Sequence, residues 1–176
     1  MNLKIAAWAA IVNAILVIPA TTLTIVAAVS KNPIVSAFVI SLTILGGILF
    51  IPLMLGYATV AHKSRLLFLK GMAYVILPVG ILLTIWSIVM NENSGFLAVI
   101  PVIVFGMLEL IFGIAVLQLK RFGGIAIALG VLHIVQGIFL MTVLMAVLVP
   151  LTGIAIGILE AKLFFTADGM KTARQK

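Results

Sequence analysis

Apolar residues form long uninterrupted runs along this chain, and short polar turns separate the runs. An α-helix crosses the hydrocarbon core of a bilayer with about 20 apolar residues, and four runs reach that length before residue 120. Their helices are predicted over residues 5–29, 34–61, 66–90 and 96–119. The turns between them combine Pro, Gly, Asn or Ser with charged residues, which is typical of helix ends. The pattern therefore predicts four membrane-spanning helices in this part of the chain.

The last apolar run, residues 122–159, is too long for one span. It contains no charged residue and would reach about 57 Å as a single helix, whereas the hydrocarbon core is about 30 Å thick. Pro150 favours a helix start, because proline fits the first helical turn and disfavours helical backbone just before it. We therefore predict a turn between Thr142 and Pro150, and two further helices at about 123–145 and 148–165.

The distribution of positive charge favours six helices over five. Cytoplasmic loops of membrane proteins collect Lys and Arg. With six spans and a cytoplasmic N-terminus, ten basic residues lie inside and Lys31 alone lies outside, whereas five spans split them six against five. The ten are Lys4, Lys63, Arg65, Lys70, Lys120, Arg121, Lys162, Lys171, Arg174 and Lys176. The sequence thus predicts that both chain ends are cytoplasmic.

Composition narrows the class of protein further. Of 176 residues, 65% are hydrophobic and 9% are charged, and the mean hydropathy is +1.43, whereas soluble domains are about 45–50% apolar. This excludes a soluble enzyme and a disordered protein. It indicates an all-α helix bundle, one transmembrane domain over residues 1–176, in a prokaryotic inner (plasma) membrane. The lipid bilayer is the partner that this composition requires, and no nucleic acid is expected, since the net charge of +7 is spread over several turns.

No catalytic residue, cofactor or metal is expected. The chain has no Cys, which excludes thiol nucleophiles and cysteine-ligated metals. Its two His residues, His62 and His133, fall at an interface and at mid-membrane, so they cannot share a metal or a haem. A glycine-rich phosphate loop and a Ser/His/Asp trio are both missing from the sequence. We therefore predict that the protein is not an enzyme.

One pattern of small and ionisable residues stands out in the fourth and fifth predicted helices. Each helix carries an ionisable residue between two glycines, at spacings of three and four, so that all three lie on one stripe. The stripes are Gly106, Glu109 and Gly113 in one helix and Gly130, His133 and Gly137 in the next. Glu109 and His133 lie equally far from the basic turn between the helices, about 16–18 Å along the axis. We therefore expect the carboxyl and the imidazole to meet near the bilayer centre, with Gln136 nearly one turn away.

Two interpretations of this intramembrane polar pair stay open. Ionisable residues inside a membrane are costly and commonly mark proton paths or ligand sites, and His changes its charge near neutral pH. Alternatively, the pair is a hydrogen bond that fixes the register of two closely packed helices. Neutral amides at both positions distinguish the two, because only the first interpretation predicts lost activity with intact folding.

Small residues also mark the first and last predicted helices. Ala6, Ala10 and Ala14 recur every four residues, and Gly153 and Gly157 have the same spacing. Such faces allow helices to pack closely in membranes. They serve packing within the chain or docking onto a partner, and packing within the chain is the simpler use.

Several remaining residues are expected at the inner membrane interface. Trp8 and Tyr57 are predicted to anchor there, as amphipathic rings prefer. Glu160 and Lys162 fall at the same level, where we expect water to solvate them. Lys70 lies one turn inside its helix and is expected to extend its amine to the surface.

The C-terminal third contains the run FGIAVLQLKR (residues 112–121) and, after an apolar helix, PLTGIAIGI (residues 150–158). This succession resembles the end of small uncharacterised bacterial multi-span membrane proteins, with Phe122-Gly123-Gly124 where those have Trp-Ala-Arg. The resemblance implies a helical membrane protein and no particular activity. The helix number and the alanine ladder also resemble the substrate-binding subunits of energy-coupling-factor vitamin transporters, although the polar ligand-binding loops of that family are missing.

Two functions are compatible with these features. The first is a structural or accessory subunit of a membrane assembly, binding other membrane proteins or a second copy of itself through small-residue faces. The alternative is a small transporter or channel-like carrier of a small molecule, ion or proton, with Glu109, His133 and Gln136 along the path.

Overall fold

Long helices make up the part of the protein that the structure describes. The computed structural model describes residues 2–89, 99–142 and 148–174. Over these ranges the helices are α1 (Leu3–Ser30), α2 (Pro33–Lys63), α3 (Leu67–Val89), α4 (Val99–Leu117), α5 (Gly124–Thr142) and α6 (Val149–Arg174), with a short 3₁₀ turn, η2 (Lys120–Phe122), before α5. All six α-helices are long and apolar enough to cross a membrane. The prediction of an all-α, six-helix membrane protein is confirmed.

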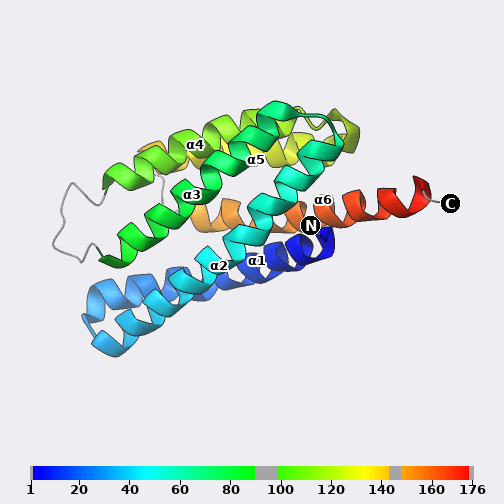
Figure 1. The fold of residues 1–176 in the computed structure, drawn as a ribbon. Coiled ribbons are helices and arrows are strands. Elements are labelled where there is room, and N and C mark those ends of the chain that lie inside the picture. The colour runs from blue at the N-terminus through cyan, green and yellow to red at the C-terminus, as the bar shows by residue number, and fades with distance from the viewer. Residues whose placement is uncertain (1, 90–98, 143–147, 175–176) are drawn as a thin grey trace.

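Successive helices run in opposite directions, so that both chain ends lie at one end of the bundle (Figure 1). The α2–α3 and α4–α5 turns lie at this end too, and the α1–α2 turn lies at the other. We call it the basic end, because its two turns carry Lys63, Arg65, Lys120 and Arg121. The two remaining predicted turns, the polar one after α3 and the one between α5 and α6, fall largely on residues 90–98 and 143–147, outside the described ranges.

Local sequence sets the helix ends at the α1–α2 turn. Lys31 takes a left-handed backbone conformation, with φ 50°, and its N–H donates to the carbonyl of Ala27. The side chain of Asn32 then accepts the N–H of Ile34 at 2.9 Å, and Pro33 is the first residue of α2. An Asn cap followed by Pro is a favourable helix start. This polar turn therefore ends one helix and begins the next within a few residues.

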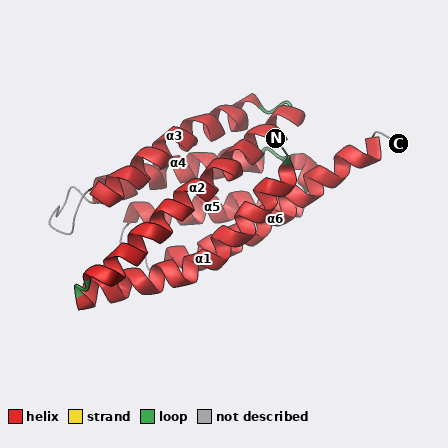
Figure 2. Cartoon of the chain, turned by 60° about the horizontal axis from the view of Figure 1, so that its bottom comes forward, coloured by secondary structure: helices red, strands yellow, loops and turns green. Residues whose placement is uncertain are grey.

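Helix packing is strongest in two pairs. The most extensive contacts join α4 to α5 and α1 to α6, whereas α3 touches α4 over a small area. Figures 1 and 2 show α1 and α6 side by side along much of their length. The largest fully buried side chains are Tyr57, Phe112 and Phe164, which lie together where these pairs meet.

The last helix continues well past its predicted end. Hydropathy predicts a span that closes at about residue 165, but α6 runs on to Arg174. Ala167 is buried and Met170 packs against the core, so the helix gains packing on one face after its sequence turns polar. Glu160 is therefore near the middle of α6 instead of near its end.

Candidate functional site

Glu109 and His133 are in direct contact inside the bundle. Oε1 of Glu109 lies 2.6 Å from Nδ1 of His133, and the two residues are only 6% and 3% exposed. The Gln136 amide donates to the same carboxyl oxygen at 3.4 Å. The contact forms because α4 and α5 are an antiparallel hairpin, which places residues equally far from the turn at the same level.

Two pairs of glycines hold the α4 and α5 backbones together on either side of this contact. A Cβ on Gly106 would lie 2.8 Å from the carbonyl oxygen of Gly137, and one on Gly113 would lie 2.6 Å from that of Gly130. A Cβ on Gly137 would lie 2.6 Å from the carbonyl oxygen of Gly106, and one on Gly130 would lie 2.9 Å from that of Gly113. Real Cβ atoms do not approach backbone this closely, so only glycine fits at these four positions.

Two residues that the sequence analysis placed at the interface belong to the same buried site. Tyr57 is fully buried, and its hydroxyl oxygen lies 3.2 Å from Nε2 of His133. Glu160 is 4% exposed; its Oε1 lies 3.8 Å from the same nitrogen, and its carboxyl also interacts with the Tyr57 hydroxyl. The interface prediction was wrong for both residues. Glu160 lies deeper because α6 extends to Arg174, and Tyr57 points inward from the packed side of α2.

One sequence signal could have identified Glu160. Gly157 stands three residues before it, the same spacing that joins a glycine to Glu109 and to His133. The sixth helix therefore carries a third copy of the glycine-plus-ionisable motif that marks α4 and α5. No comparable signal points to Tyr57.

The hydrogen-bonded network continues away from the imidazole toward the far end of the bundle. Thr152 donates its hydroxyl to Oε1 of Gln136 at 2.9 Å. Thr152 and Glu160 both lie on α6, and their spacing corresponds to about 12 Å along the helix axis. We call the connected side chains the polar cluster: Tyr57, Glu109, His133, Gln136, Thr152 and Glu160. Within the described residues, every buried side-chain nitrogen and oxygen has a hydrogen-bond partner.

Aromatic rings enclose the imidazole end of the polar cluster. The Phe112 ring stands edge-on to both Tyr57 and His133, with centroids 4.8 and 5.1 Å away, and the Phe164 ring stands 5.1 Å from Tyr57. Phe112 and Phe164 are fully buried. In such an apolar surrounding, hydrogen bonds and charges interact more strongly than they do in water.

The net charge of the polar cluster depends on how many protons its imidazole and carboxyl groups bind. With a neutral imidazole and both carboxyls ionised the cluster carries two negative charges, and it becomes neutral when two more protons bind. Burying an unbalanced charge is costly, so the proton content of the cluster and the packing around it are coupled. Among the residues that the structure describes, no three His, Asp or Glu side chains are arranged to hold a metal ion.

The predicted small-residue faces of α1 and α6 are used within the chain. A Cβ on Gly157 would lie 2.7 Å from the Cβ of Ala14 and 3.0 Å from the carbonyl oxygen of Ala10. Ala6 packs in the same way on Gly56 of α2, where an added Cβ would lie 2.6 Å from the alanine Cβ. These contacts join α1, α2 and α6 into one block.

Gly153 differs from the other glycines of the predicted faces. An added Cβ would meet only Val17 and Gln136, at 3.7 and 3.9 Å, which are ordinary contact distances. The α1–α6 approach therefore requires glycine at position 157 and not at position 153.

The polar cluster spans the interface between two such blocks. Tyr57, Thr152 and Glu160 come from the block of α1, α2 and α6, whereas the other three members come from the α4–α5 hairpin. Within each block, small residues set the contact. Between the blocks, the polar cluster supplies two hydrogen bonds and the 3.8 Å approach of Glu160 to His133.

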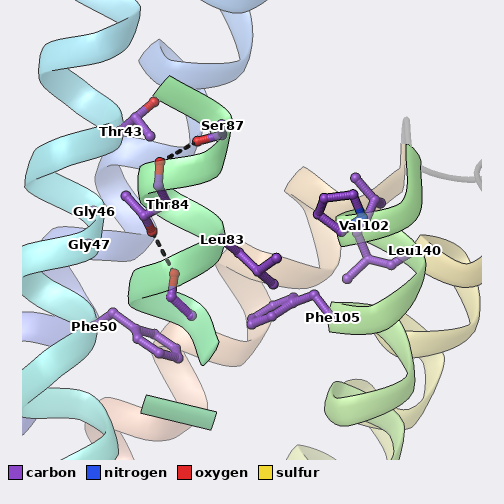
Figure 3. A pocket seen from close by; sticks show the side chains of 12 residues that line it. Thr43, Gly46, Gly47, Phe50, Leu83, Thr84, Ser87, Val102, Phe105 and Leu140 are labelled. Carbon is purple, nitrogen blue, oxygen red and sulfur yellow. Dashed lines mark hydrogen bonds between the residues drawn. The ribbon is translucent and has the colours of Figure 1, made fainter. Parts of the chain in front are cut away.

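A cavity of about 350 Å³ lies apart from the polar cluster, between α2, α3 and α4 (Figure 3). Its three hydroxyls already bond to backbone carbonyls of their own helices: Thr43 to Val39, Thr84 to Gly80 and Ser87 to Thr84, at 2.8–2.9 Å. Because these hydroxyls already donate their hydrogens to backbone, because no ionisable side chain lines the cavity, and because no polar-cluster residue lines it, this cavity is not our candidate site.

No protein-family model, curated protein or solved structure matches this chain. The resemblances to small bacterial multi-span proteins and to vitamin-transporter subunits stay predictions. Fold and site together define a multi-pass helical membrane protein with a buried set of polar and ionisable side chains.

Proposed function

We propose that the protein is a small transporter or channel-like carrier that moves protons across its membrane, with the polar cluster as the proton-binding site. One observation carries the proposal: a buried imidazole stands between two buried carboxyls, Glu109 at Nδ1 and Glu160 at Nε2. Groups of this kind inside a membrane are costly and mark ion and proton pathways. We further propose the inner membrane of a bacterium as its location, with both ends of the chain in the cytoplasm.

The order of hydrogen bonds supports proton movement along the bundle. From Thr152 the hydrogen bonds pass through Gln136 to Glu109, then across the imidazole to Tyr57. Glu160 lies 3.8 Å from the same imidazole nitrogen as Tyr57. Each of these groups can accept or donate a hydrogen bond, and an imidazole can gain a proton at one nitrogen and lose one at the other. The span of about 12 Å covers a good part of the hydrocarbon thickness.

The arrangement of small residues makes the accessory-subunit hypothesis the weaker candidate. That hypothesis rests on faces free to dock onto a partner. The alanines of α1 and the glycines of α4, α5 and position 157 instead contact other helices of the same chain. A partner would therefore need a different surface.

Proton flux into liposomes tests the proposal. The purified protein is reconstituted, a potassium diffusion potential is set with an ionophore, and internal pH is followed with a dye. We expect acidification faster than in empty liposomes, and a several-fold slower rate for Glu109→Gln and His133→Asn. Asp168→Asn is the matched control, because it removes a carboxyl from α6 outside the polar cluster.

Folding is measured in parallel by size-exclusion chromatography and circular dichroism in detergent. Slower flux in a variant that keeps the wild-type profile supports a proton-binding role. If wild type does not exceed empty liposomes, or if folded Glu109→Gln conducts as fast as wild type, the proposal is wrong and the pair only fixes helix register.

A further inference from the structure

The two turns of the basic end line a second, polar cavity that is open to the surface. Its volume is about 470 Å³, and the α2–α3 and α4–α5 turns contribute equally to its wall. The lining residues are Lys63, Ser64, Arg65, Leu66, Gln118, Leu119, Lys120 and Arg121. Four cations thus face one cavity, and no carboxylate is among the described residues that line it.

Neighbouring hollows share the same cations. Lys63 and Arg121 also line a cavity of about 190 Å³ that reaches α6, and Arg65 lines one of about 300 Å³ together with Lys70. Lys63, Arg65 and Arg121 are thus shared between adjoining hollows at the basic end. Like charges on one surface create a positive potential, which favours the binding of an anion there.

Buried apolar residues hold both turns in place. Leu119 and Phe122 are 1% and 8% exposed and anchor the α4–α5 turn in the core. In the α2–α3 turn, Arg65 has a left-handed backbone conformation, with φ 57°. The N–H of Leu66 donates to the carbonyl of Ala61 and closes this turn. The backbone positions from which the cationic side chains extend are thus fixed before any ligand binds, which lowers the entropy cost of binding.

We infer that this cavity is a binding site for a phosphate-bearing anion, most directly the headgroup of an anionic phospholipid. Arg and Lys are the residues that bind phosphate oxygens, and basic pockets between membrane helices hold anionic headgroups. Leu66 in the wall is partly exposed and places apolar surface beside the cations, which suits a lipid better than a free anion. The site lies at the basic end, and its ligand binding is independent of proton transport by the polar cluster.

Thermal unfolding of the purified protein in a neutral detergent tests the inference. Three probes are titrated separately: phosphatidylglycerol, phosphatidylcholine and sodium phosphate. Arg65→Gln and Arg121→Gln each remove one cation from the cavity. Lys162→Gln is the matched control, because Lys162 is an exposed cation on α6 that lines neither this cavity nor its neighbours. Unfolding temperatures without any probe show that each variant is folded.

We expect phosphatidylglycerol, and not phosphatidylcholine, to raise the unfolding temperature of the wild type. Arg65→Gln and Arg121→Gln should each bind phosphatidylglycerol about fivefold more weakly, as the loss of one cation near a membrane surface predicts, while Lys162→Gln binds as the wild type does. A shift of equal size with sodium phosphate supports the same site with a soluble anion as its ligand.

Two results would overturn the inference. One is an equal effect of phosphatidylglycerol and phosphatidylcholine. The other is equal weakening by Lys162→Gln and by the two cavity variants, which would mean that the overall positive charge of this surface attracts lipid without a defined site.

Discussion

Glu160 approaches His133 from the opposite side of the imidazole to Glu109. Its Oε1 lies 3.8 Å from Nε2, whereas Oε1 of Glu109 lies 2.6 Å from Nδ1. One ring therefore connects α4 and α6, which are far apart in the sequence. The two carboxyls are not equivalent, because only Glu109 is within hydrogen-bonding distance of the imidazole.

This difference predicts unequal effects of removing each carboxylate charge. Glu109→Gln replaces a short contact to the imidazole and should lower the free energy of unfolding by about 1–3 kcal/mol. Glu160→Gln should change it by less than about 1 kcal/mol, because it also removes one of two carboxyls that compete for one imidazole. Denaturation by SDS titration, followed by circular dichroism, measures both. Equal losses would contradict the assigned roles.

The glycine pairs of the α4–α5 hairpin predict a strong effect from a single methyl group. Gly113→Ala would place its Cβ 2.6 Å from the carbonyl oxygen of Gly130, so the helices must separate, at a cost of about 1–3 kcal/mol. Gly71→Ala in α3 is the matched control, since nothing lies within 4 Å of its added Cβ. It should be neutral, or stabilising by up to about 1 kcal/mol from helix propensity. A Gly113→Ala protein as stable as Gly71→Ala would contradict the close approach.

The α1–α6 contact predicts that two glycines four residues apart respond differently. Gly157→Ala meets Ala14 at 2.7 Å, whereas Gly153→Ala meets nothing closer than 3.7 Å. We expect the first substitution to lower the unfolding temperature in detergent and the second to leave it unchanged or raise it. The opposite order would show that α1 and α6 pack in another register.

Single cysteines test the predicted orientation in the membrane, and no native cysteine interferes. Lys31 and Lys120 are exposed in turns at opposite ends of the bundle. In intact cells, a membrane-impermeant maleimide should label Lys31→Cys, and it should label Lys120→Cys only after permeabilisation. Labelling in the reverse order would invert the orientation, and labelling of both positions from one side would exclude the antiparallel arrangement across the bilayer.

The sequence was sufficient to predict the helices and those contacts that are made between helices consecutive in the chain. Helix number follows from apolar runs and basic turns. Glu109 and His133 could be matched because a tight hairpin relates them by their distance from one turn. The glycine stripes could be read from the same periodicity.

The other half of the polar cluster depends on which distant helices lie side by side, and hydropathy carries no information about that. Tyr57 reaches His133 from α2, and Glu160 reaches it from α6. A hydropathy profile also ends a span where polar residues begin. It therefore predicted that Glu160 lies at the membrane interface in contact with water. The extension of α6 depends on tertiary burial of Ala167, which a local pattern cannot predict.

The division of the bundle into two blocks determines what a change of pH can disturb. Inside each block, close contacts of glycine with backbone or with alanine hold the helices together, and these contacts do not change with protonation. The Glu109–His133 contact lies within the α4–α5 hairpin, whereas Tyr57, Glu160 and Thr152 reach that hairpin from the other block. A change of pH therefore acts on the joint between the blocks and on one contact inside the hairpin, while the glycine contacts persist, so a pH-dependent rearrangement of this protein would be a relative movement of the blocks without loss of helix.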